Sequence, residues 1–92
     1  MLADTLHCRV LTTAFAQALR DHIADHDRPL AALGSAARSI ADLLVTAREQ
    51  AAAIAAPRYD ELAMALQEAV AALWVEFGGA PGEAPKAPLP QN

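Results

Sequence analysis

The sequence predicts an all-α protein, in which a helical hairpin (residues 29–56 and 58–77) is preceded by one shorter helix near residues 4–26. Three observations support this fold class. Apolar residues recur at helical spacing, 24 of the 92 residues are alanine, and prolines stand between the apolar stretches. Alanine favours helix strongly but buries little surface. We therefore expect one small helical domain over residues 1–77, which oligomerises to supplement a thin core.

The first helix is expected to begin near Asp4, whose carboxylate can accept hydrogen bonds from the free backbone N–H groups of an opening turn. Apolar residues gather on one side of this helix and polar residues on the other, so it is amphipathic. The apolar side comprises Cys8, Leu11, Phe15, Ala18, Leu19 and Ile23. The polar string before Pro29 ends the helix, because the residue before a proline is disfavoured in the α region.

The second helix carries the clearest pattern in the chain, an unbroken heptad seam. Its positions alternate by three and four residues, which places them on one narrow stripe: Leu30, Leu33, Ala37, Ile40, Leu44, Ala47, Ala51 and Ile54. Pro29 suits the first turn of this helix, where its missing N–H leaves no bond unmade. A seam of this kind indicates a helix that lies against another helix, and we expect it to form the oligomer interface.

The third helix and the tail are delimited by proline and glycine. Asp60 is a natural cap for the helix, although Pro57 can begin it instead. Gly78 and Gly79 are expected to end it, because glycine adopts a left-handed conformation without penalty. Four prolines follow between positions 80 and 92. Residues 78–92 are therefore predicted to be a flexible Pro-rich tail that is dispensable for assembly.

Composition also bears on the compartment. Cys8 is the only cysteine, which rules out an internal disulfide and fits a reducing environment. The first ten residues lack the basic segment and apolar run of a secretory signal, and no uninterrupted apolar stretch has the length of a membrane span. A cytoplasmic protein without membrane contact is expected.

The reactive side chains form no catalytic or metal site by spacing. His22 and His26 are four residues apart, as in some metal sites, but no third ligand accompanies them, and histidines near a helix end also interact well with its dipole. Cys8 would lie roughly 20 Å from His22 along a straight helix. Its neighbour His7 would point away from it, so the two cannot act as nucleophile and base. We expect no catalytic residue, no metal and no cofactor, and hence a non-enzymatic protein.

The charge argues against strong nucleic-acid binding. The formal net charge is −4, with seven basic and eleven acidic residues, and the arginines are spread along the chain. A symmetric ring can nevertheless gather one arginine from each subunit on a common surface. Arg9, Arg20 and Arg28 are the candidates, and any contact with double-stranded DNA is expected to be weak and non-specific.

The stretch from Arg28 to Leu44, which continues into Ala47-Arg48-Glu49, resembles the oligomerisation helices of small terminase subunits of tailed phages and phage-like gene transfer agents. The resemblance covers roughly residues 28–77 and consists of Ala/Leu/Arg periodicity. It implies a hairpin that packs around an axis into a ring and presents DNA to the large terminase ATPase-nuclease, with the tail 78–92 as a tether. Family members usually carry an N-terminal helix-turn-helix domain, whereas the residues before Pro29 leave room for one helix. The resemblance therefore implies a minimal DNA-packaging subunit.

A second class of protein fits the same features. A small homodimeric adaptor, or an antitoxin-like inhibitor acting by protein–protein interaction, requires only the seam, the acidic charge and the tail. The mass in solution separates the two classes, because a ring contains many copies of the 9.7 kDa chain and an adaptor only a few.

Overall fold

A computed structural model describes the backbone of residues 2–85 and the side chains of residues 9–85. The elements in this range are α1 (Leu2–Ile23), α2 (Pro29–Gln50), the short 3-10 helix η1 (Ala53–Ala55) and α3 (Ala56–Glu76). The prediction of an all-α fold with three helices is confirmed. The predicted roles of the Asp4, His7 and Cys8 side chains, and the tail from residue 86 to 92, lie outside the described residues.

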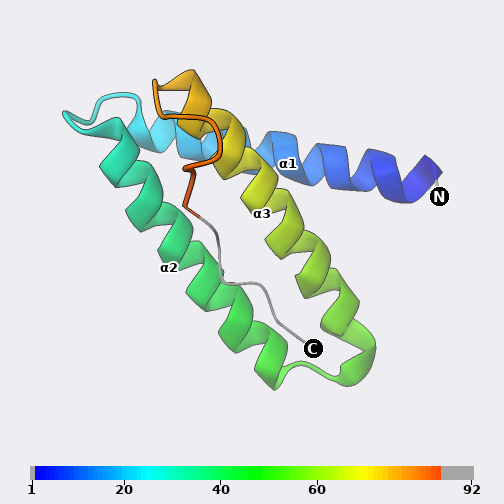
Figure 1. The fold of residues 1–92 in the computed structure, drawn as a ribbon. Helices are drawn as coiled ribbons and strands as arrows, with labels where there is room; N and C mark the ends of the chain where they lie inside the picture. Colours follow the sequence, from blue (N-terminus) through cyan, green and yellow to red (C-terminus); the bar gives the residue numbers. More distant parts are fainter. Residues whose placement is uncertain (1, 86–92) are drawn as a thin grey trace.

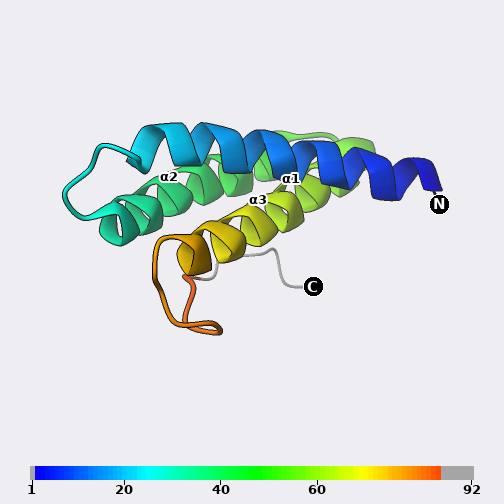
Figure 2. The same cartoon turned by 90° about the horizontal axis from the view of Figure 1, so that it is seen from above.

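The hairpin is formed by α2 and α3, and α1 lies across one face of it (Figures 1 and 2). α1 crosses the hairpin near the end where α2 begins and α3 finishes (Figure 1). Two side-chain links hold α1 to α3: Thr12 Oγ1 donates to Glu68 Oε2 at 3.2 Å, and Arg20 Nε donates to Glu76 Oε2 at 2.9 Å. The later residue of α1, Arg20, pairs with the later residue of α3, Glu76. α1 and α3 therefore run in roughly the same direction.

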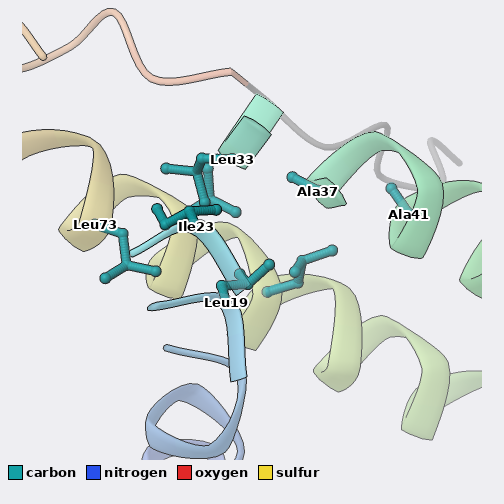
Figure 3. Close-up of a cluster of buried hydrophobic side chains, with 8 residues drawn as sticks. Leu19, Ile23, Leu33, Ala37, Ala41 and Leu73 are labelled. Carbon is teal, nitrogen blue, oxygen red and sulfur yellow. The ribbon is translucent and has the colours of Figure 1, made fainter. Parts of the chain in front are cut away.

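The core is small and lies where the three helices meet. α1 inserts Leu19 and Ile23 toward the hairpin, and Figure 3 shows these side chains close to Leu33 and Leu73. The cluster of buried side chains comprises Leu19, Ile23, Leu33, Ala37, Ala41, Leu66, Val70 and Leu73. Three helices therefore share a few large side chains, and alanines allow the backbones to approach one another.

The connection between α2 and α3 differs from the prediction. α2 ends at Gln50 rather than near residue 56, because Ala51 and Ala52 are extended, with ψ of 155° and 149°. The alanines of this stretch bury little surface that would hold the helix straight, and the chain must reverse before Pro57. Pro57 then occupies the first turn of α3, where it costs no hydrogen bond.

Because α2 ends at Gln50 and α3 begins at Ala56, the predicted seam and the predicted cap of the third helix both change. Ala51 and Ile54 lie beyond the helix on which the seam was placed. Asp60 lies within α3 instead of capping it, and its Oδ1 accepts from Arg48 Nε at 2.9 Å. The ion pair therefore joins the two arms of the hairpin.

The end of α3 follows the predicted glycine signal. Gly78 has φ of 97°, its N–H donates to the Val75 carbonyl at 3.0 Å, and the Gly79 N–H donates to the Trp74 carbonyl at 2.7 Å. These two bonds make a Schellman motif, which satisfies the last carbonyls of the helix. A side chain at Gly79 would overlap the Trp74 indole, so both glycines are required.

The first residues after this motif are held against the hairpin instead of extending freely. Trp74 Nε1 donates to the Ala80 carbonyl at 3.0 Å, and Gln67 Nε2 donates to the Pro85 carbonyl at 3.2 Å. This segment runs on the side of the hairpin away from α1 (Figure 2). The indole N–H needs an acceptor, and the returning chain supplies one. Residues 80–85 are thus part of the fold.

Leu66→Ala should lower the free energy of unfolding by about 2–5 kcal/mol, because it leaves a cavity among small neighbours that cannot fill it. Leu66 is 0% exposed. Val10→Ala is the matched control, since Val10 is 65% exposed and its truncation should change stability by no more than about 0.5 kcal/mol. Urea denaturation followed by circular dichroism measures both. Equal losses in the two variants would show that the core is elsewhere.

Candidate functional site

The predicted seam is divided between the core and the surface. Leu33 and Ala37 are buried within the chain, and Ile54 is 91% exposed. The other five positions are half-buried: Leu30, Ile40, Leu44, Ala47 and Ala51. Part of the seam therefore packs against the chain's own helices, and the part nearer the connection to α3 keeps exposed apolar surface.

The second half of α2 lies beyond the crossing with α1 (Figure 1). Leu43 is 70% exposed there, and with Ile40 and Ala47 it forms a stripe at helical positions i, i+3 and i+7. We call Ile40, Leu43 and Ala47 the open stripe. Leu43 was not among the predicted seam residues, because a strict heptad excludes it; counting a wider apolar face on α2 would have found it.

An apolar groove between α1 and α2 adjoins the open stripe. It has a volume of about 370 Å³ and is lined by Phe15, Ala18, Leu19, His22, Ala36, Ser39 and Ile40. Because Ile40 belongs to both, the groove and the open stripe form one apolar surface. A surface of this shape suits an amphipathic helix of another chain.

The hydropathy of α2 agrees with this exposure. By length and composition α2 is apolar enough to cross a membrane, a test that core helices of soluble proteins also pass. Only 17% of its most apolar window is buried within the fold. Most residues of this window are therefore at least partly exposed.

The three candidate arginines are not brought together in one chain. Arg9 and Arg28 are exposed: Arg9 lies on α1, roughly 20 Å along the axis from the end of that helix at 1.5 Å per residue, and Arg28 directly precedes α2. Arg20 makes a two-pronged ion pair with Glu76, with Nε–Oε2 and Nη2–Oε1 distances of 2.9 Å. The hydrogen bond from Arg20 lowers the pKa of Glu76, and Glu76 in turn raises the pKa of Arg20. The Nε and Nη2 donors of Arg20 are therefore already occupied by Glu76.

A polar hollow lies where α1 meets the start of α2. It has a volume of about 430 Å³, and its polar lining consists of His22, His26, Arg28, Ser35 and Ser39. The two imidazole centroids are 5.3 Å apart. Sequence spacing identified the histidines, but the two serines come from another helix and gave no signal of their own.

The described residues offer no complete metal site. Among them, no group of three or more His, Cys, Asp or Glu side chains is arranged to hold a metal ion. Buried side-chain nitrogen and oxygen atoms in this part of the chain all have hydrogen-bond partners, so none points to a missing ligand. The site thus consists of two surfaces, the apolar one on α2 and the polar hollow at its start.

The chain matches no protein-family model, no curated protein and no solved structure. Its function is therefore argued from these two surfaces.

The carboxyl group of Glu76 should titrate below its ordinary value of 4.5, because Arg20 stabilises the charged form. A lowered pKa in the folded state means that the stabilisation is present above the unfolded value and is lost as the pH falls through the folded value. Carbon-detected NMR titration measures the midpoint. Arg20→Gln should move it upward, whereas Arg38→Gln, a matched change at an exposed position of α2, should leave it in place. An unchanged midpoint in Arg20→Gln would refute the pairing in solution.

Proposed function

We propose that this chain is a non-enzymatic assembly subunit that binds copies of itself through the open stripe, and that it serves as a small terminase subunit in DNA packaging. The observation that carries the proposal is the exposed apolar surface on the half of α2 beyond the α1 crossing. Such a surface on a small domain with a thin core favours association.

A second copy is the partner that fits this surface. The open stripe is flanked on one side by Ser39 and Gln50, which are exposed and uncharged. Two copies can therefore approach along this edge without like-charge repulsion, although each carries a net charge of −4. Ala47 within the stripe allows close approach of two helix backbones. Contact between two identical stripes closes as a two-fold dimer, whereas a ring requires the stripe of one copy to pack on a different surface of the next copy.

The terminase role rests on the resemblance of residues 28–77 together with this surface. In a ring, Arg9 and Arg28 would recur around the axis and supply the cations for weak, sequence-independent contact with double-stranded DNA. Arg20 would contribute less, because Glu76 competes for it. The large terminase subunit is the proposed partner for the predicted tail 78–92, of which residues 78–85 lie against the hairpin. The proposed compartment is the cytoplasm, without membrane contact.

One observation favours the alternative, a small homodimeric adaptor or antitoxin-like inhibitor. The Arg20–Glu76 pair leaves two of the three candidate arginines for DNA on a chain of net charge −4. A protein–protein function needs the open stripe but not the arginines. Mass and DNA affinity together decide between the two proposals.

Self-association should be lost in the double variant Leu43→Asp/Ile54→Asp. Both residues are exposed, at 70% and 91%, so the new charges disturb an interface between chains without entering the core of one chain. Light scattering after size exclusion should give a multiple of 9.7 kDa for the wild type and 9.7 kDa for the variant. Val10→Asp, which adds a charge at a site 65% exposed on α1, should keep the wild-type mass. A monomeric wild type would overturn the assembly proposal.

DNA binding should be measurable at about 50 mM salt and should fall steeply as salt rises, with little preference for sequence. Arg9→Gln and Arg28→Gln should each weaken it, and Arg38→Gln should serve as the charge-matched control. Fluorescence anisotropy on short duplexes measures the affinity, and a pull-down with a large terminase subunit tests the partner. A stable dimer that shows neither interaction would assign the chain to the adaptor class.

A further inference from the structure

We propose that the polar hollow at the start of α2 is a binding site for a phosphate group. The lining brings five hydrogen-bond donors to one place from two helices and the loop between them: His22, His26, Arg28, Ser35 and Ser39. This assignment goes beyond self-association, and of the five donors only Ser39 also flanks the edge along which two copies are proposed to approach.

The chemistry of the lining selects an anion over a cation. Arg28 is exposed, and among residues 9–85, whose side chains the structure describes, no carboxylate is paired with it. The neighbouring Asp25 and Asp27 do not line the hollow. A guanidinium group donates to two oxygens at once and is well suited to phosphate, whereas its positive charge opposes a metal ion beside the histidines.

The two histidines and the two serines complement the arginine. Imidazole centroids separated by 5.3 Å can direct an N–H each toward oxygens of one phosphate group. Ser35 and Ser39 are four residues apart on α2, so their hydroxyls lie on one face of the helix. The donors therefore come from both walls of the hollow.

The size of the hollow indicates a phosphate that belongs to a larger molecule. Its volume of about 430 Å³ falls in the range of small-molecule sites. The remaining lining is alanine, from Ala31, Ala32 and Ala36, which leaves apolar floor beside the charged groups. A nucleic-acid backbone and a free phosphorylated small molecule share this chemistry, and binding experiments distinguish them.

The test uses the full ¹⁵N-labelled chain, titrated with sodium phosphate at constant ionic strength. The amide resonances of His22, His26, Ser35 and Ser39 should shift and saturate. Arg28→Gln should weaken the affinity about ten-fold or more, since a charge-assisted hydrogen bond is lost. Arg38→Gln, which removes the same charge elsewhere on α2, should not. His22→Gln is a second variant and should weaken binding in the same direction as Arg28→Gln.

Two results would overturn the site: phosphate shifts that do not saturate, or an equal loss of affinity in Arg38→Gln and Arg28→Gln. A parallel titration with a short DNA duplex identifies the source of the phosphate. Shifts of the same amides by the duplex would support a nucleic-acid backbone, and shifts by free phosphate alone would support a small phosphorylated ligand. The mass of the assembly is measured on the same samples, so failure of the phosphate site is distinguishable from failure of self-association.

Discussion

The fold depends on the insertion of two α1 side chains, Leu19 and Ile23, between the arms of the hairpin. Five of the nine buried residues of α2 and α3 are alanines, which bring the backbones close but fill little volume. Ile23 is 0% exposed and follows Leu19 by one helical turn, so both reach the same cleft. Burying a side chain of this size contributes about 1.5–3 kcal/mol, a large share of the stability of a small domain. Without α1, the hairpin would lose much of its core.

This arrangement leaves the two ends of the hairpin unequal. The end that α1 crosses contains the large buried residues, whereas the end at η1 has Leu43 and Ile54 in contact with solvent. One helix can cover only part of a hairpin when it crosses at an angle. The open stripe is therefore a consequence of how α1 packs. A partner that covers it would bury the apolar surface that α1 leaves exposed. For this reason α2 contributes residues both to the core and to the proposed assembly contact.

The helices were predicted well from the sequence, because apolar periodicity and the prolines and glycines at helix ends are local signals. Pro29 and Gly78 mark a helix start and a helix end in the structure as they did in the pattern. The end of α2 was not predictable in the same way, since a run of alanines favours helix on either side of a turn that only the hairpin requires. A heptad seam also does not say whether the helix that packs against it belongs to the same chain or to another copy. Leu33, a seam residue, is buried against helices of its own chain. The pairing of Arg20 with Glu76 joins positions 56 residues apart and left no trace in local spacing.

The polar hollow shows why net charge alone does not determine what a surface binds. The chain carries −4, yet the lining around Arg28 contains donors and no carboxylate. Ile23 ends α1 inside the core, and the chain must then turn outward to reach Pro29. That turn carries His26 and Arg28 to the start of α2, opposite Ser35. The hollow reaches from the start of α2 to Ser39 and adjoins the open stripe at Ile40, so the two proposed surfaces are neighbours along one helix.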